Sequence, residues 1–255
     1  MKKWFLIFAA AVICMVSAAA VGAGEKAEIK AGDYVSFGSY PQTAEGTDKT
    51  PIEWLVLDVQ DGTALLISRY ALETIAYDEN RDKSITWEIS GLRAWMNEEF
   101  LNSAFTPEEQ AAILTTDVDN SDETIYRWED PFAALLMGAT SVRASGGNDT
   151  RDKVFALCCT EAQKYFETTP EDQVTGARAA PTDYALAHDP DLKEGKYQTE
   201  DGKDSVSWWL RSPAYYADMA SCVENDGKMD TTFVFNEKYC ARPALWADLN
   251  TDFFR

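Results

Sequence analysis

The chain has 255 residues, of which 43 are acidic and 23 basic, so its formal net charge is −20 at pH 7. Such an acidic chain is unsuited to nucleic acids and to anionic membrane surfaces, because both select basic patches. Its length is sufficient for one large domain or two small ones with a substantial apolar core.

The N-terminus has the pattern of a signal peptide. Two lysines precede an apolar run over residues 4–20, and small residues follow at 21–23. We therefore expect export with cleavage after Ala23, then a linker over 24–32 and a single domain over 33–255. A transmembrane anchor is the alternative, but the run is short and passes directly into charged residues.

Strand signals come first in the predicted domain. A short strand is expected over 34–38. The β-branched and aromatic run over 52–59 and the apolar run over 63–68 are separated by Gln60-Asp61-Gly62, which is typical of a hairpin turn. These two runs are therefore predicted to pair as antiparallel strands.

Two helices are predicted next. Apolar side chains recur at helical spacing, namely Ile89, Leu92, Trp95, Met96 and Phe100. This pattern predicts an amphipathic helix over 86–101. Thr106 followed by Pro107 is typical of a helix start, so a second helix is expected over 106–114.

The middle of the chain is rich in loops. Residues 117–150 are mostly polar and are predicted to form a long surface insertion. A buried strand is expected over 154–158, and a short helix capped by Thr160 over 160–166. One or two helical turns are expected over 181–187.

The C-terminal part is predicted to consist of strands. The run Ser207-Trp208-Trp209-Leu210-Arg211-Ser212-Pro213 precedes three further apolar runs, over 219–224, 231–235 and 239–246. The turns between these last three runs are short, so sequential antiparallel pairing is expected.

The two adjacent tryptophans indicate a strand that is covered on both faces, because they bring a very large apolar area. Strict alternation places Trp208 with Leu210 on one face and Trp209 with Arg211 on the other. A buried Arg211 requires an acidic partner. The predicted structural core contains Trp54, Trp95, Trp208, Trp209, Arg211 and Arg242.

Seven motifs, spread from residue 37 to residue 245, resemble those of a known family. They are Phe37-Gly38-Ser39-Tyr40-Pro41-Gln42, Ile52-Glu53-Trp54-Leu55-Val56-Leu57, Leu65-Leu66-Ile67-Ser68, Leu92-Arg93-Ala94-Trp95-Met96-Asn97, Asp152-Lys153-Val154-Phe155, Trp208-Trp209-Leu210-Arg211-Ser212-Pro213 and Arg242-Pro243-Ala244-Leu245. In this order they look like a family of uncharacterised extracellular domains from Gram-positive bacteria, and the resemblance covers roughly residues 31–250.

The closing pattern is also similar to the C-type-lectin-like fold of formylglycine-generating-enzyme relatives and of variable receptor proteins from retroelement systems. This resemblance implies an α+β fold with a mixed, mainly antiparallel sheet, two packed helices and long loops that form a ligand face. The catalytic cysteine pair of those enzymes has no match here, and neither do the calcium motifs of sugar-binding lectins. The resemblance therefore implies a fold but no reaction.

Four cysteines follow the signal peptide: Cys158, Cys159, Cys222 and Cys240. A disulfide between Cys222 and Cys240 is possible if their strands are neighbours, and the alternative is that both are small buried apolar residues. A copper or redox site is a further alternative, because clustered thiolates select soft metals.

Other candidates for chemistry are weak. Asp117, Asp119 and Asp122 alternate as calcium ligands do, but the run lacks the glycine of a calcium loop, and solvated acids are the alternative interpretation. His188 is the single histidine and is expected in a solvated loop rather than as a general base. No catalytic residue and no cofactor is therefore predicted.

The candidate ligand-binding surface follows Pro213. Tyrosines with small and polar neighbours make adaptable contact surfaces, and the corresponding region carries ligand contacts in the variable receptor proteins that the chain resembles. The alternative is that both tyrosines pack against the Trp208-Trp209 strand. The candidate ligand-binding residues are Tyr215, Tyr216, Asp218, Glu224, Asn225, Asp226 and Lys228.

The leading hypothesis is an exported or cell-surface recognition module without catalytic activity, which binds an extracellular protein or a carbohydrate. An oxidase related to formylglycine-generating enzymes, another metal-dependent enzyme, and a structural envelope domain that packs beside copies of itself are the alternatives. If the guanidinium of Arg211 or Arg242 opens into a pocket, that arginine becomes the first candidate for binding an anionic ligand.

Overall fold

The computed structural model describes residues 28–80, 84–121, 145–189, 192, 196–214 and 216–254. The predicted signal peptide and the first part of the linker lie outside these residues. So do Tyr215, Asp122 and most of the predicted insertion over 117–150.

A four-stranded antiparallel sheet contains the first and the last strand of the described chain. Its strands are β1 (Tyr34–Tyr40), β2 (Thr50–Gln60), β3 (Thr63–Ser68) and β11 (Ala244–Asp248), in the order β1-β2-β3-β11. β2 and β3 form the predicted hairpin. Its turn needs positive φ angles, which Asp61 (48°) and Gly62 (80°) adopt.

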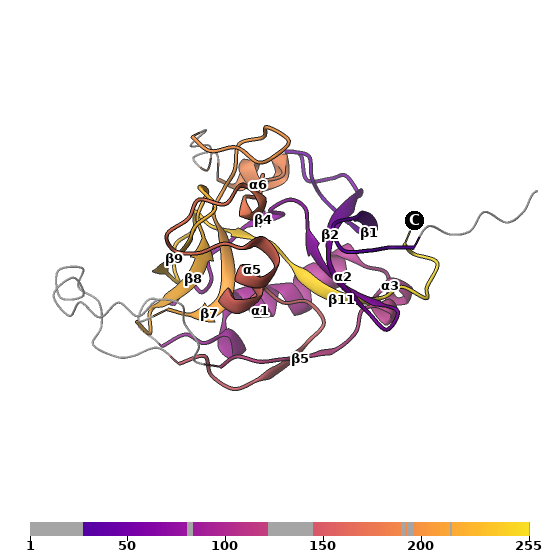
Figure 1. Ribbon diagram of the computed structural model, residues 1–255, viewed down its shortest axis with the longest axis horizontal. Coiled ribbons are helices and arrows are strands. Elements are labelled where there is room, and N and C mark those ends of the chain that lie inside the picture. The colour runs from indigo at the N-terminus through magenta and orange to yellow at the C-terminus, as the bar shows by residue number, and fades with distance from the viewer. Residues whose placement is uncertain are drawn as a thin grey trace, which may run out of the picture.

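A five-stranded sheet lies beside the first, on the left in Figure 1. Its strands are β4 (Glu73–Thr74), β10 (Cys240–Ala241), β7 (Trp208–Pro213), β8 (Met219–Val223) and β9 (Met229–Phe233), in that order. β8 and β9 pair antiparallel, as predicted, and β7 pairs antiparallel with β8. A separate two-stranded ladder joins β5 (Thr116–Val118) to β6 (Thr150–Asp152).

The helices are short. They are a 3₁₀ turn at Trp87–Ile89, α1 (Gly91–Trp95), a π-helical segment at Met96–Phe100, α2 (Leu101–Ala104), α3 (Pro107–Ala112), α5 (Cys159–Phe166), a second 3₁₀ turn at Thr175–Ala177 and α6 (Asp183–His188). The single helix predicted over 86–101 is therefore a 3₁₀ turn followed by continuous helix over 91–104. The described chain is a mixed α/β structure with mostly antiparallel strands.

Two helix starts illustrate what capping signals predict. Thr106 caps α3 as expected, because its hydroxyl accepts the Glu109 N–H at 3.2 Å and the Glu109 carboxylate accepts the Thr106 N–H at 2.8 Å. The predicted Thr160 cap of α5 is wrong. Cys158 caps this helix: its sulfur accepts the Glu161 N–H at 3.4 Å, and the Glu161 carboxylate accepts the Cys158 N–H at 2.8 Å.

The strand predicted over 239–246 as the end of the meander does not exist as one element. Cys240 pairs in parallel with Trp208 and antiparallel with Thr74, and the chain then leaves this sheet for β11, which pairs with β3. Pro243 stands at the change of sheet, since it has no N–H to continue a ladder. The last run therefore belongs to both sheets.

One apolar core extends across both sheets, and the indoles occupy its centre. Trp54, Trp208 and Trp209 have no exposed surface, and Trp95 is 9% exposed. Each of these three indoles without exposed surface donates to a backbone carbonyl: Trp54 to Phe37 at 2.7 Å, Trp208 to Ala177 at 3.0 Å and Trp209 to Ile75 at 2.8 Å. These bonds remove the cost of burying the indole N–H groups.

β7 is buried on both faces, but its side chains do not alternate strictly. Trp208 packs against Phe166 of α5, and Arg211 pairs with Glu161 of the same helix, although alternation places them on opposite faces. The ladder between β7 and β8 is irregular between Trp209 and Pro213, and this shifts the register. The predicted pairing of faces is therefore wrong at Arg211.

The disulfide considered between Cys222 and Cys240 is absent. Cys222 lies in β8 and Cys240 in β10, and β7 separates the two strands. Both thiols are free. The Cys222 sulfur contacts a Glu224 oxygen at 3.5 Å, and the Cys240 sulfur contacts the Thr74 hydroxyl at 3.8 Å, so each has a polar neighbour instead of a sulfur.

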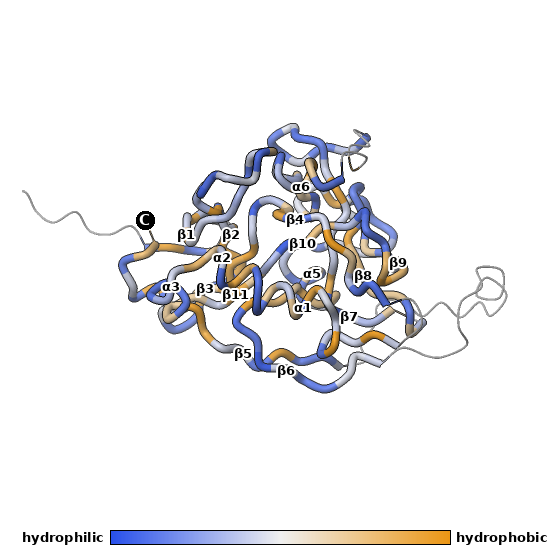
Figure 2. Tube along the Cα trace, turned by 180° about the vertical axis from the view of Figure 1, so that it is seen from behind, coloured by the Kyte–Doolittle hydropathy of each residue, from blue (hydrophilic) through white to orange (hydrophobic). Residues whose placement is uncertain are grey.

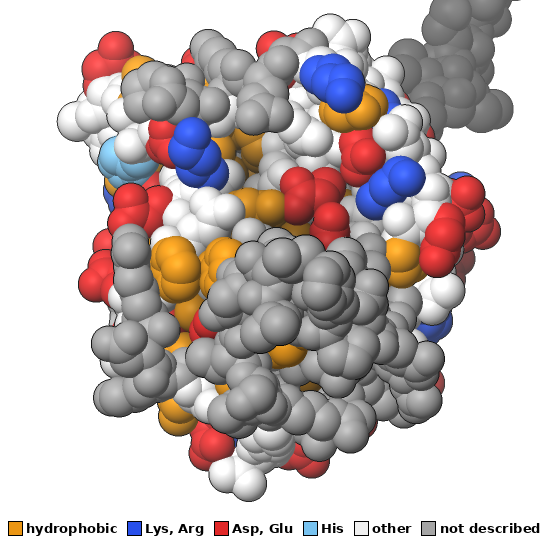
Figure 3. Space-filling model, turned by 90° about the vertical axis from the view of Figure 1, so that its left-hand side faces the viewer, with side chains coloured by type: hydrophobic (Ala, Val, Ile, Leu, Met, Phe, Trp, Pro, Cys, Tyr) orange, Lys and Arg blue, Asp and Glu red, His pale blue; other side chains and the backbone are white. Residues whose placement is uncertain are grey.

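Hydropathy follows this architecture. Figure 2 shows apolar residues along the inner strands and helices, whereas the outer loops are mostly hydrophilic. Figure 3 shows acidic side chains spread over the face that it presents, with basic ones sparse. Within the described part of the chain, every helix is too short or too polar to cross a bilayer.

Two glycines with similar backbone conformations give a matched stability test. Gly227 and Gly202 have φ angles of 87° and 77°, but a Cβ at Gly227 would lie 2.0 Å from the Val174 carbonyl oxygen, whereas a Cβ at Gly202 meets nothing within 4 Å. We expect Gly202→Ala to lower the free energy of unfolding by about 1 kcal/mol through its φ angle alone. Gly227→Ala should cost about 1–3 kcal/mol more, because of the clash. Equal losses in urea denaturation would contradict this packing of the β8–β9 turn.

Candidate functional site

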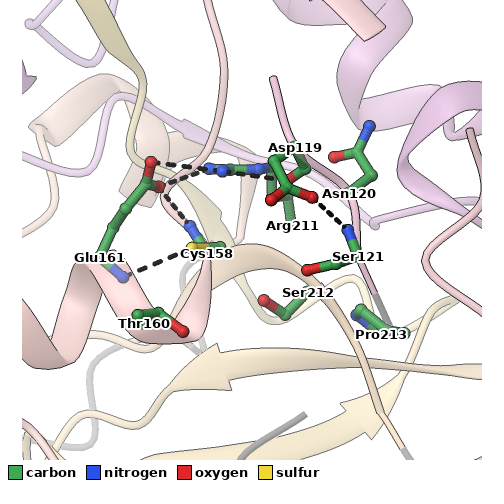
Figure 4. A pocket seen from close by; sticks show the side chains of 9 residues that line it. All are labelled: Asp119, Asn120, Ser121, Cys158, Thr160, Glu161, Arg211, Ser212 and Pro213. Carbon is green, nitrogen blue, oxygen red and sulfur yellow. Dashed lines mark hydrogen bonds and ion pairs between the residues drawn. The ribbon is translucent and has the colours of Figure 1, made fainter. Parts of the chain in front are cut away.

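A cavity of about 200 Å³ lies beside Arg211. Its wall is formed by Asp119–Ser121, which follow β5, by Cys158, Thr160 and Glu161 at the start of α5, and by 211–213 in β7. We call this the Arg211 pocket. Figure 4 shows Glu161 and Arg211 facing each other, with Asn120 and Ser121 on the opposite side of the guanidinium.

Arg211 is held by a two-point ion pair. Its Nη1 lies 2.5 Å from Glu161 Oε2, and its Nη2 lies 3.3 Å from Glu161 Oε1. The same nitrogens also donate to the carbonyls of Ala156, at 2.8 Å, and Asp119, at 3.3 Å. Burial opposes the charge on Arg211, but the Glu161 carboxylate outweighs it, so the pKa of Arg211 is raised. The sequence indicated a buried arginine needing an acid, and Glu161 is that acid.

The pocket contains unmet hydrogen-bonding capacity. In the described residues, three buried side-chain polar atoms have no hydrogen-bond partner: Arg211 Nε, Asn120 Oδ1 and Asp218 Oδ1. The first two belong to residues that line the pocket, and Asp218 follows Pro213 by five positions. Each such atom costs about 1–3 kcal/mol if it stays unpaired. Two residues of the pocket wall therefore each carry one buried polar atom without a partner.

The thiol in this pocket is not activated. Cys158 is half-buried, and burial raises the pKa of its thiol to about 11, which keeps it protonated at neutral pH. The neighbouring Ser212 hydroxyl accepts the Cys159 N–H at 2.9 Å. With a protonated thiol and a salt-bridged arginine, the Arg211 pocket is equipped to donate and accept hydrogen bonds rather than to supply a nucleophile.

The structure places the residues predicted to bind ligand in two groups. Tyr215 lies outside the described residues, while Tyr216 and Asp218 are half-buried just beyond the Arg211 pocket in the chain. Glu224 and Asn225 are held by Ser207, whose hydroxyl donates to the Glu224 carboxylate at 2.8 Å and accepts the Asn225 N–H at 3.0 Å.

The turn after Glu224 is packed against the segment that follows α5. The Thr168 hydroxyl donates to the Gly227 carbonyl at 2.6 Å, and Gln173 donates to the Asp226 carboxylate at 3.1 Å. The Lys228 N–H donates to the other Asp226 oxygen at 3.0 Å. The polar groups of Glu224, Asn225 and Asp226 are thus hydrogen-bonded to other residues of the same protein.

The calcium candidates are separated by other contacts. Asp117 pairs with Arg151 at 3.1 Å, and the Asp119 carboxylate accepts the Ser121 N–H at 2.8 Å. Asp122 lies outside the described residues. Across the residues that the structure describes, no three His, Cys, Asp or Glu side chains are grouped to hold a metal ion.

His188 is exposed to solvent, as expected, but it lies at the end of α6 and not in a loop. Its Nδ1 lies 2.5 Å from a Glu73 oxygen, and its ring packs edge-on against Tyr184 with ring centroids 4.4 Å apart. The other Glu73 oxygen accepts the Tyr40 hydroxyl at 3.2 Å. Burial raises the pKa of Glu73, although His188 and Tyr40 oppose that shift.

Sequence reasoning missed three residues of the Arg211 pocket: Asn120, Glu161 and Ser212. Glu161 could have been found, because a glutamate three positions after a residue with a hydrogen-bonding side chain is the capping-box spacing, here with Cys158 in place of serine or threonine. Asn120 and Ser212 have no such local signal. Their position depends on contacts distant in sequence.

Glu161→Ala should destabilise the protein by leaving Arg211 buried without a countercharge. We expect a loss of about 3 kcal/mol, at the low end for a broken buried ion pair because the Glu161 side chain is 30% exposed. The control is Lys164→Gln on the same helix, which removes an exposed pair with Asp58 and should cost less than about 1 kcal/mol. Equal losses for both variants in chemical denaturation would contradict a structural role for the Arg211 ion pair.

Glu73→Gln should change the pH dependence of stability. Because the folded pKa of Glu73 is raised, its contribution to stability is complete below its ordinary pKa and is lost as pH rises through the folded value. The neutral glutamine cannot ionise and lacks this loss. The free energy of unfolding of the variant should therefore rise relative to that of the wild type as the pH is raised from about 4 to about 7. Urea denaturation at both pH values measures the difference. The same comparison in a His188→Asn background removes the imidazole that contacts Glu73, and a gain toward acid pH there would overturn the assignment.

Comparison with known proteins shows a family but no function. Residues 61–249 match a domain of unknown function, DUF6273, and this span is 189 of the 255 residues. It begins in the β2–β3 turn and ends just after β11, so it includes the five-stranded sheet and the Arg211 pocket. No curated protein and no solved structure matches the chain. The protein therefore belongs to the DUF6273 family.

Proposed function

We propose that the protein is an exported recognition module without catalytic activity, and that it binds a polar, uncharged group of an extracellular protein or carbohydrate in the Arg211 pocket. One observation carries the proposal. A donor, Arg211 Nε, and an acceptor, Asn120 Oδ1, both lack partners and belong to residues that line the same cavity.

The charge of the pocket favours a neutral group. Glu161 neutralises Arg211 through two contacts, so an incoming anion gains little and also meets the Glu161 carboxylate. A hydroxyl or an amide can both donate and accept, which matches the two unpartnered atoms. Such groups are abundant in sugars and in peptide backbones.

The size of the pocket points to partial insertion of a larger ligand. Pockets for whole small molecules occupy about 300–1,000 Å³, whereas this cavity measures about 200 Å³. It therefore fits one functional group while the rest of the partner lies on the neighbouring surface. Tyr216 and Asp218, which follow β7, are the part of the predicted ligand surface nearest to it in the chain.

The proposal also includes a fold and a location that the resemblance implies. These are a C-type-lectin-like arrangement of sheets, helices and loops, and a place at the surface of a Gram-positive cell or outside it. The mainly antiparallel sheets and the long segments between elements support the first, and the signal-peptide pattern at residues 1–23 supports the second. No contact among the described residues favours the oxidase or the envelope role instead.

The probe for this proposal is N-acetylglucosamine, which carries hydroxyls and an amide. Titration followed by backbone amide shifts should move the signals of Asn120, Ser121 and Thr160. Asn120→Leu should abolish these shifts, since it removes the unpartnered acceptor, whereas Asn102→Leu on exposed α2 should leave them unchanged. Thr160→Val, at an exposed position of the pocket wall, should weaken binding without altering the melting temperature.

Two results would overturn the proposal. One is the absence of shifts at these amides with both N-acetylglucosamine and N-acetylalanine amide, a probe for peptide groups. The other is that the shifts survive Asn120→Leu. The spectrum of the remaining residues shows whether each variant is folded.

A further inference from the structure

Arg242 is a buried cation at the junction of the two sheets. It is 3% exposed, and its guanidinium carbon lies 4.8 Å from the Trp208 ring centroid and 5.1 Å from that of Phe166. Its Nε donates to the Ser68 carbonyl at 3.0 Å, and its Nη1 to the Ala177 carbonyl at 3.4 Å. The aromatic faces and two carbonyls hold the guanidinium in place.

Arg242 differs from Arg211 in having no carboxylate partner. Among the described residues, no acidic side chain lies within ion-pair distance of it. Burial accordingly lowers the pKa of Arg242 to about 10, the direction expected for a buried cation without a countercharge. A buried charge in this state gains strongly from an anion that reaches it.

An anion can approach because Arg242 lines a cavity. The cavity measures about 300 Å³ and also has Arg69 and Arg178 in its wall. The Arg178 side chain donates only to the carbonyls of Asp226 and Gln198, at 3.2 and 2.8 Å, so its charge too is unpaired within the described residues. Two of the three guanidiniums therefore lack a carboxylate.

The charge of the wall favours one negative charge rather than two. Arg69 already has two carboxylate partners, Asp201 in the wall at 3.0 Å and Glu53 outside it at 3.2 Å. Within the described residues, the wall's groups without an ion pair are then Arg178, Arg242 and Glu200, which leaves one excess positive charge among these three in a chain of net charge −20. A carboxylate balances this excess, while a phosphate dianion exceeds it and meets the acids.

The rest of the wall suits hydroxyl groups on a ring. Thr175 contributes a hydroxyl, and Tyr34 and Tyr70 contribute aromatic surface. The Thr199 hydroxyl is engaged within its own turn, since it donates to Asp201 at 2.6 Å and accepts the Lys203 N–H at 3.2 Å. Glu200 is exposed and forms no ion pair with a described residue, so its carboxylate is available to accept from ligand hydroxyls. The volume is at the lower end of the range for small-molecule sites, which fits a single ring.

We propose that this cavity, the Arg242 pocket, binds an acidic sugar, with the ligand carboxylate on Arg242 and Arg178 and its hydroxyls on Glu200 and Thr175. Bidentate arginine contacts to a carboxylate are among the stronger hydrogen bonds in proteins. The site is separate from the Arg211 pocket, so either can exist without the other.

The test uses D-glucuronate, with D-glucose as the uncharged match. Isothermal titration of the full chain should show binding of glucuronate and at least tenfold weaker binding of glucose. Arg178→Gln should weaken glucuronate binding by about tenfold, the loss expected for one hydrogen bond to a charged group. Arg151→Gln is the matched control: Arg151 is 73% exposed and lies outside the Arg242 pocket, so affinity should not change.

Two further measurements test the carboxylate contact and the hydroxyl contacts separately. Glu200→Gln should reduce the preference for glucuronate over acetate, because it weakens the acceptor for the sugar hydroxyls. Bound glucuronate should also raise the melting temperature of the wild type more than that of Arg178→Gln. Equal binding of glucose and glucuronate, no effect of Arg178→Gln, or tighter binding of inorganic sulfate than of glucuronate would overturn the assignment to an acidic sugar.

Discussion

The structure depends on the burial of β7 on both of its faces. All six residues of this strand are buried, and the two indoles reach in different directions: Trp208 to the turn at Thr175–Ala177 and Trp209 to Ile75 beyond β4. Arg211 extends the same strand to α5 through Glu161. Helices and loops from distant parts of the sequence therefore pack against the same strand, and Arg211 of this strand lines one of the two pockets.

The two buried arginines show how one residue type can serve two purposes. Arg211 is neutralised by Glu161, so its pocket has no excess charge and offers hydrogen bonds. Arg242 is supported by rings and carbonyls alone, and it keeps an uncompensated charge. The difference lies in the surrounding residues. Glu161, near the start of α5, faces Arg211, whereas Phe166, at the end of α5, faces Arg242. Helix α5 thus contacts both arginines.

Local signals predicted what depends on local structure. The β2–β3 hairpin, the pairing of β8 with β9 and the Thr106 cap follow from turn residues, alternation and capping spacing. The division of the last run at Pro243 and the separation of Cys222 from Cys240 depend on the order of strands in a sheet, which no short window encodes. An acid beside Arg211 was expected because a buried arginine needs one. Asn120 and Ser212 were not expected, because contacts distant in sequence bring them to the pocket.

The division of the last run between the sheets also bears on the order in which the molecule folds. β10 lies between β4 and β7 in one sheet, and β11 closes the edge of the other against β3, with Asp248 opposite Thr63. Neither sheet can be completed while residues 240–248 are still being synthesised. Pairings so far apart in sequence form slowly, because the intervening chain must be ordered first. Both sheets of such a chain remain incomplete until β10 and β11 pair, and the pairing of these two strands then completes both.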